Sequence, residues 1–115
     1  MVKKEYVPDR GDLVWLNFTP QAGHEQRGKR PALILSPRAY NKKVHLALVC
    51  PITSTEKGYP FEVRIEGKKV KGSVLSDQVK SLDWTVRDIG YIEKCDTEAF
   101  EQVLGNIRAL IVGDE

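Results

Sequence analysis

The sequence predicts a protein that is mainly β with some α (α+β class): a small, strongly curved antiparallel sheet or barrel closed by one C-terminal helix. Two observations lead to this prediction. Short apolar or alternating runs, separated by glycine, proline and polar turn residues, occupy most of the chain as far as Lys94. From Asp96 onward the apolar residues recur instead with the period of a helix. Several short strands followed by a single helix are typical of this fold class.

The first half of the chain contains three runs with the composition of strands. Each is rich in apolar residues and is bounded by proline, glycine or polar residues. Arg38–Asn41, before the third run, is expected to form one helical turn or an irregular bend. Pro51 cannot donate a ladder hydrogen bond, so it is expected at the end or at an edge of the third strand, with Thr53 and Ser54 at the strand's tip. The three predicted strands are Asp12–Phe18, Ala32–Ser36 and Val44–Cys50.

The second half begins with a clearer strand pattern. In Phe61–Ile65 apolar residues alternate with charged ones, which indicates a half-exposed strand. Asp83–Arg87 is expected to form a short turn. Three further short strands are predicted at Ser73–Leu75, Gln78–Leu82 and Gly90–Lys94.

A helix is predicted over Asp96–Val112. Asp96 or Thr97 can cap its first turn, and Gly113 suits its end. Its apolar residues fall on one face, which we expect to lie on the sheet as part of the core. They are Phe100, Val103, Leu104, Ile107, Leu110 and Ile111.

Length and composition narrow the function classes. A chain of 115 residues is expected to form one domain over 1–115, large enough for a core without disulfide or metal staples. The 18 basic and 16 acidic residues give a net charge of only +2, so any nucleic-acid-binding surface must be local. The lysine cluster at 68–71 is interpreted as solvated surface.

Other cues exclude metal and membrane roles. Cys50 is expected to be a small buried hydrophobe, and no paired Cys/His spacing indicates zinc. No clustered set of carboxylates suggests a two-metal nuclease, so neither metal nor cofactor is predicted. The N-terminus lacks the apolar core of a signal peptide, and no apolar run approaches the length of a membrane span. We therefore expect a cytoplasmic protein.

The most unusual stretch is the long charged connection between the first two strands. It contains Gly23 and Gly28, whose backbone freedom lets the loop move or approach a ligand closely. Pro31 fixes the chain as it re-enters the sheet and favours an extended conformation for Arg30. Arg30 at a rigid strand mouth and Glu25 on the mobile part together suggest a gated polyanion site.

Several motifs in register point to one family. They are Gly11-Asp12-Leu13-Val14-Trp15, Phe18-x-Pro20, Gly23-x-Glu25-Gln26-x-Gly28-x-Arg30-Pro31, Ser36-Pro37, Pro51-Ile52-Thr53-Ser54, Lys57-Gly58-Tyr59-Pro60-Phe61-Glu62-Val63 and Ser76-Asp77-Gln78-Val79-Lys80-Ser81. Over about Tyr6 to Val112 the chain resembles the MazF/PemK family of ribonuclease toxins from type II toxin–antitoxin systems. That resemblance implies an SH3-like, CcdB/PemK-like barrel. His24 departs from the pattern, because the family commonly has a small residue there.

The resemblance implies cleavage of single-stranded RNA at a short sequence by its own 2′-hydroxyl, without a metal, leaving 2′,3′-cyclic phosphate and 5′-hydroxyl ends. Arg30 fits stabilisation of the phosphorus centre, since its planar fork matches phosphate oxygens; a surface ion pair is the alternative. Thr53 can donate to a phosphate oxygen or simply shape a turn. Glu25 is the best carboxylate base, although loop closure and antitoxin recognition remain open for it. His24 is chemically suited to proton transfer, yet the family works without a histidine there.

RNA recognition requires charge, aromatic faces and polar side chains that reach base edges. The aromatic residues Trp15 and Phe61 are expected in the core instead, and His45 is expected to be structural. The predicted RNA-binding residues are Lys29, Ser54, Tyr59, Gln78 and Lys80.

The resemblance also implies partners: a homodimer, a cognate MazE-like antitoxin with an extended acidic segment, and operator DNA reached only through the antitoxin. Two other functions stay open. One is a CcdB-like toxin that binds DNA gyrase and cleaves nothing; the other is a non-catalytic RNA-binding module. Both would dispense with Arg30 and Thr53, so these two residues discriminate among the three functions.

Overall fold

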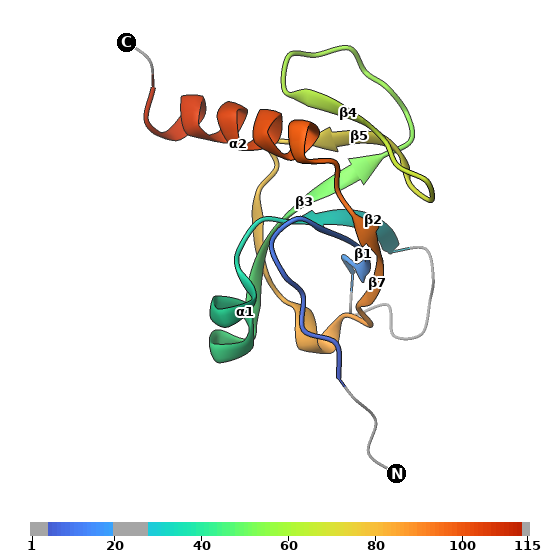
Figure 1. Cartoon of the computed structure of the whole chain (residues 1–115), viewed down its shortest axis with the longest axis vertical. Helices are drawn as coiled ribbons and strands as arrows, with labels where there is room; N and C mark the ends of the chain where they lie inside the picture. The colour runs from blue at the N-terminus through green and yellow to red at the C-terminus, as the bar shows by residue number, and fades with distance from the viewer. Residues whose placement is uncertain (1–4, 20–27, 114–115) are drawn as a thin grey trace.

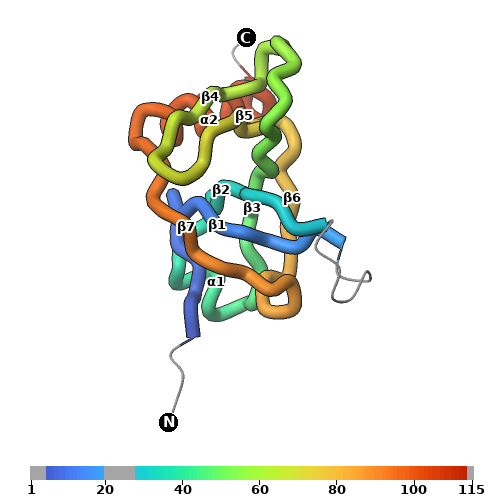
Figure 2. Tube along the Cα trace, turned by 90° about the vertical axis from the view of Figure 1, so that its right-hand side faces the viewer, coloured from blue at the N-terminus to red at the C-terminus, as the bar shows by residue number. Residues whose placement is uncertain are grey.

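The third strand, β3 (Leu46–Thr53), organises the sheet of this protein, whose computed structural model describes residues 5–19 and 28–113. One edge of β3 pairs with β2 (Lys29–Ile34). Along its other edge, the first half of β3 pairs with β6 (Lys80–Asp83) and the last two residues pair with β5 (Lys71–Leu75). Because β3 changes partner along its length, the sheet curls into two lobes (Figure 2).

The remaining strands extend these two lobes. β1 (Asp12–Asn17) lies between β2 and β7 (Gly90–Lys94), and β4 (Glu62–Glu66) pairs with β5. All the pairings are antiparallel, and the sheet of seven described strands has the order β4-β5-β3-β2-β1-β7 with β6 beside β3. The predicted mainly β fold, a curled antiparallel sheet with a C-terminal helix, is confirmed.

The C-terminal helix α2 (Thr97–Ile111) covers the lobe made by β4 and β5 (Figure 1). Asp96 caps it as predicted, because its side chain accepts a hydrogen bond from the Ala99 N–H. Phe100 and Val103 are buried against the sheet. Leu110 and Ile111, expected on the same buried face, are instead 53% and 77% exposed, because the last turns of α2 extend beyond the sheet (Figure 1).

Each face of β1 contributes to a separate core. Leu13 belongs to a core between the β4–β5 lobe and α2, together with Phe100 and Val103. Val14 and Leu16 belong to a second core on the opposite face, closed by Trp84. This agrees with the prediction of a strand buried on both sides, which is possible because successive side chains point to opposite faces.

Several predicted boundaries were wrong. The second strand begins at Lys29, not Ala32, because its charged residues also pair with β1. The segment 38–41, expected to be one helical turn or a bend, belongs to a longer helix, α1 (Arg38–Val44). His45 was predicted to lie in the third strand, but it ends α1 with a left-handed φ of 65°. β3 continues through Pro51 to Thr53, so Pro51 does not end it. β4 and β6 each begin later than predicted, and β5 begins earlier. The short turn predicted after β6 contains the 3-10 helix η2 (Trp84–Val86). The bounds of β7 match the prediction.

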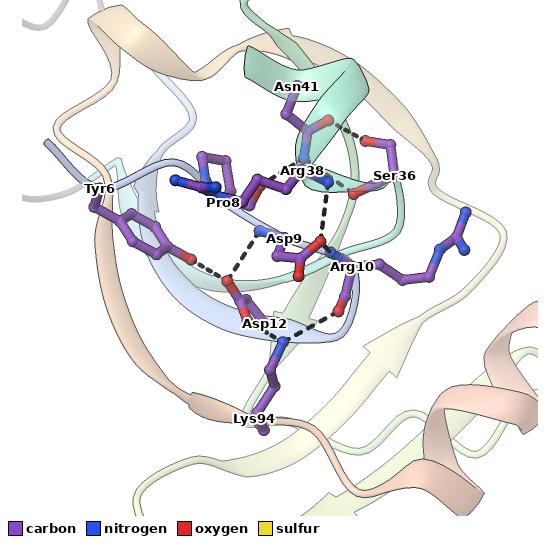
Figure 3. A network of polar contacts seen from close by, with 9 residues as sticks. All are labelled: Tyr6, Pro8, Asp9, Arg10, Asp12, Ser36, Arg38, Asn41 and Lys94. Carbon is purple, nitrogen blue, oxygen red and sulfur yellow. Dashed lines mark hydrogen bonds and ion pairs between the residues drawn. The ribbon is translucent and has the colours of Figure 1, made fainter.

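A buried polar network ties the N-terminal segment to the sheet (Figure 3). Asp12 is 3% exposed, and its carboxylate accepts hydrogen bonds from the Tyr6 hydroxyl and from the Asp9 N–H at 2.9 Å. Lys94 on β7 pairs with the same carboxylate at 2.7 Å. Burial, followed by the bond to Asp12, raises the pKa of Tyr6 far above its ordinary value, so the phenol remains a hydrogen-bond donor.

Both cysteines are free thiols. Cys50 lies in the first core, as predicted, and burial raises its pKa to about 12, so it stays protonated. Among the described residues, no helix has the length and apolar character needed to cross a membrane.

Candidate functional site

The candidate site is an opening between β2 and β3. Their pairing ends at Ala32↔Pro51, and the next residue of β2 toward its N-terminus is Pro31. Neither proline has an N–H to donate, so the ladder does not continue past this point. Beyond it β3 turns to pair with β5, which places Arg30 and Thr53 on opposite sides of the opening.

The opening is an open pocket of about 460 Å³. Among the described residues that line it, three are cationic and none is acidic. A cluster of like charges around a concave surface attracts an anionic ligand, because their fields add there. The lining residues are Trp15, Lys29, Arg30, Pro31, Ile52, Thr53, Ser54 and Lys71.

A second pocket of about 270 Å³ is also lined by Arg30. Arg30 is the residue that the two pockets share, and the two together are here called the groove. The second pocket is lined by Phe18, Thr19, Gly28, Arg30, Pro51, Gln78 and Lys80. The structure thus brings together Arg30, Thr53, Ser54, Lys29, Gln78 and Lys80, which is most of the set predicted from the sequence.

Thr53 ends β3 with its hydroxyl beside the groove. Its Oγ1 accepts a hydrogen bond from the Thr55 N–H at 3.1 Å. The turn-shaping role considered for this residue is therefore real. A hydroxyl that accepts this bond keeps its own proton, which it can donate to a phosphate oxygen. Gly72 allows β5 to pack closely against the backbone of Thr53, because a Cβ at Gly72 would lie 2.6 Å from the Thr53 carbonyl oxygen.

Lys29 forms a salt bridge with Asp88 that a phosphate group can replace. Its Nζ lies 3.0 Å from Asp88, whose side chain is 73% exposed. An exposed pair of this kind contributes about 0–1 kcal/mol, so a phosphate group can compete for the ammonium.

Sequence analysis missed two groove residues. Trp15 was expected in the core, yet it is 44% exposed and lines the groove. Its neighbours across the sheet are the small residues Pro31 and Gly90, and α2 covers the other lobe. Lys71 belongs to the cluster interpreted as solvated surface but also lines the groove, because β5 runs beside Thr53. The motif around Trp15 was recognisable, but alternation alone could not separate a buried position from a groove.

Phe61 differs from its prediction, and Tyr59 lies outside both pockets. Phe61 is half-buried and not part of either core. Tyr59, predicted to bind RNA, lines neither pocket. Its hydroxyl donates to Asp77 at 2.7 Å, and this bond, more than any other cause, raises the pKa of Tyr59 to about 12.

The ends of the charged loop are joined at the groove. The Phe18 N–H donates to the Gly28 carbonyl at 2.8 Å, and the Thr19 N–H donates to the Asn17 side chain at 2.9 Å. Gly28 has a steric role, since a Cβ there would lie 1.8 Å from the Thr19 hydroxyl oxygen. Two residues of the prediction, Glu25 and His24, lie outside the described residues.

Fold and groove define a class: a small curled-sheet protein with a cationic groove centred on one arginine and flanked by a hydroxyl and an exposed indole. No group of three or more potential metal-ligating His, Cys, Asp or Glu side chains occurs within the described part of the chain.

Comparison with known proteins is consistent with this class. Residues 9–111 match the family model described as "PemK-like, MazF-like toxin of type II toxin-antitoxin system". The endoribonuclease toxin MazF of Escherichia coli K12 is 44% identical over 92% of this chain and 96% of its own. A crystal structure of MazF from Deinococcus radiodurans superposes with a TM-score of 0.85 at 50% identity, covering 94% of this chain and 99% of that one. A MazE–MazF structure from the same organism gives 0.83 at 44% identity, covering 93% and 97%.

This chain therefore belongs to the family of PemK-like, MazF-like toxins of type II toxin–antitoxin systems.

Proposed function

We propose that this protein is a toxin endoribonuclease that cleaves single-stranded RNA at a short sequence and so inhibits translation and growth. The observation that carries the proposal is the placement of Arg30 and Thr53 across one cationic groove. Relatives that align over nearly the whole chain are named endoribonucleases. A CcdB-like gyrase-binding toxin is the alternative, but such a binder would not need these two side chains in a groove.

The proposed reaction is attack of the ribose 2′-oxygen on the adjacent phosphorus. The 2′-oxygen–phosphorus bond forms and the bond to the 5′-oxygen breaks, leaving a 2′,3′-cyclic phosphate and a 5′-hydroxyl. A base takes the 2′ proton and an acid returns one to the 5′-oxygen. The fork of Arg30 neutralises charge on the phosphoryl oxygens, while Thr53 donates to one of them. Glu25, which lies outside the described residues, is our proposed base.

The rest of the groove binds the RNA strand. Lys29, Lys80 and Lys71 supply charge along the backbone, and Ser54 and Gln78 supply hydrogen bonds. The exposed indole of Trp15 adds a face for base stacking. The strand thus crosses Arg30 between the two pockets.

Cleavage is expected to persist in excess EDTA and to stop when one 2′-deoxynucleotide stands at the cut site. The deoxy substrate lacks the nucleophile but keeps its phosphates, so its binding should change little. End analysis of a long single-stranded RNA, with and without EDTA, measures all of this. Loss of cutting in EDTA would contradict metal independence, and cleavage of the deoxy substrate would contradict attack by the 2′-oxygen. A wild-type protein that binds gyrase and cuts no RNA would favour the alternative.

The proposed homodimer is supported by apolar side chains that the single chain leaves exposed. Leu110, Ile111 and Val112 at the end of α2 are 53%, 77% and 66% exposed, and Leu48 and Val79 on the side of the molecule near β6 are 37% and 39% exposed. Figure 1 shows β6 descending from the region below α2 toward α1 on one side of the molecule. Apolar surface of this kind is commonly covered by another chain.

Ile111→Glu is expected to weaken self-association at least tenfold. Burial of an isoleucine contributes about 1.5–3 kcal/mol, and a charge in its place adds a desolvation cost. Sedimentation equilibrium across a concentration series measures the change. Gln102→Glu, an exposed change on the same helix, is the matched control. Equal dissociation constants for the two variants would exclude this end of α2 from the interface.

We also propose a cognate MazE-like antitoxin, with operator DNA reached only through it. MazE–MazF complexes from D. radiodurans are among the structures similar to this chain. An extended acidic segment suits the cationic groove, since its carboxylates would take the places of phosphates. RNA and antitoxin would then weaken each other's binding reciprocally.

A further inference from the structure

The loop from Thr55 to Phe61 joins β3 to β4 beside the groove. It leaves Ser54, which lines the larger pocket, and returns to the sheet at Glu62, the first residue of β4. Its first part, Thr55–Gly58, is polar and ends in glycine, and such a segment has many conformations when no other group binds it. In this protein two carboxylates hold it.

The Glu62 carboxylate accepts two hydrogen bonds from the backbone of the loop. Its Oε2 accepts the Lys57 N–H at 2.6 Å, and its Oε1 accepts the Gly58 N–H at 2.8 Å. Gly58 has a φ of +79°, a conformation that residues with a Cβ rarely adopt. The carboxylate therefore fixes two consecutive amides around a bend that only glycine makes easily.

Asp77 holds the other side of the loop. Its carboxylate accepts the Tyr59 hydroxyl at 2.7 Å, across the gap between the loop and the β5–β6 connection. The raised pKa of Tyr59, about 12, keeps this phenol a donor at physiological pH. Gln78 follows Asp77 directly in the chain and lines the smaller pocket beside Arg30. Through Asp77, Tyr59 thus connects the loop to the segment that contains Gln78, without lining the groove itself.

We propose that Glu62 and Asp77 are positioning residues. They hold the Thr55–Phe61 loop against the Asp77–Gln78 segment and so fix Ser54 and Gln78, the groove residues that adjoin them in the chain. The positions of these two residues determine which nucleotide is accepted beside the cleaved bond. The inference rests on the proposed function, since it concerns the RNA preference of the same groove. Tyr59 acts through its hydroxyl, which joins the loop to Asp77, rather than as a stacking surface.

The test compares cleavage of a randomised single-stranded RNA by wild type, Tyr59→Phe, Asp77→Ala and Glu62→Gln. Tyr59→Phe keeps the ring and removes only the hydroxyl; Glu62→Gln replaces one acceptor with a donor that faces an N–H. Each is expected to reduce the ratio of kcat/KM between preferred and disfavoured sequences about tenfold, the equivalent of one hydrogen bond to a charged group. The loss should appear mainly as a higher KM at preferred sequences.

Glu66→Gln is the matched control, because it makes the same change on the same strand at an exposed pair with Arg64. Combining Tyr59→Phe with Asp77→Ala should cost no more than either change alone, since both remove the same bond. A Tyr59→Phe preference profile identical to wild type would overturn the inference while leaving the proposed function intact. A wild-type protein that cuts no RNA would instead overturn the proposed function.

Discussion

Arg30→Ala is expected to slow RNA cleavage about a hundred- to a thousandfold at saturating RNA. The estimate is the cost of removing one preorganised charge-stabilising group, about 2.7–4 kcal/mol. Among the described residues, Arg30 is the one that lines both pockets of the groove. Arg30→Lys should restore little, because an ammonium lacks the bidentate fork.

Single-turnover rates measure this effect separately from RNA binding. Thr53→Val, which keeps the shape and removes the hydroxyl, should also slow cleavage without unfolding the protein. Arg38→Ala is the control: this exposed arginine begins α1 outside both pockets, and its backbone N–H makes the bond to Asp9. His24→Ser should remain active. Wild-type rates for Arg30→Ala would make this arginine a surface charge and remove the basis of the proposed mechanism.

Asp12→Ala is expected to lower the free energy of unfolding by about 3 kcal/mol, the largest stability effect that we predict. The carboxylate is buried, and its loss breaks the ion pair with Lys94 and leaves the Tyr6 hydroxyl and the Asp9 N–H without their acceptor. Breaking a buried pair costs roughly 3–5 kcal/mol; the lower end applies because Lys94 is itself half exposed and can be hydrated.

For a domain of this size the change corresponds to a fall in Tm on the order of 10–20 °C. Urea unfolding of wild type, Asp12→Ala and Glu66→Ala gives the comparison. Glu66 forms a salt bridge of similar length with Arg64, but on the surface, where solvent screens the two charges, so its loss should change the free energy of unfolding little. If Asp12→Ala were no more damaging than Glu66→Ala, the network of Figure 3 would not be what anchors the N-terminal segment.

The sequence by itself determined the class of fold and the position of most elements. Period-two alternation and the later helical period are local signals, because they follow from the geometry of one strand or one helix. The motifs indicated the family, and the resemblance to that family predicted six of the site residues: Arg30, Thr53, Lys29, Ser54, Gln78 and Lys80. The structure places these six along one groove.

The tertiary structure decided which surfaces are covered. Trp15 and Leu13 have the same strand parity, but the first lines the groove and the second is buried in a core with Phe100 and Val103. Ile111 follows the helical period of apolar residues, but it is exposed because the last turns of α2 extend beyond the sheet. Lys71 reaches the groove because β5 pairs with the end of β3. Each outcome depends on contacts between segments far apart in the chain, and a local pattern contains no information about what lies opposite it.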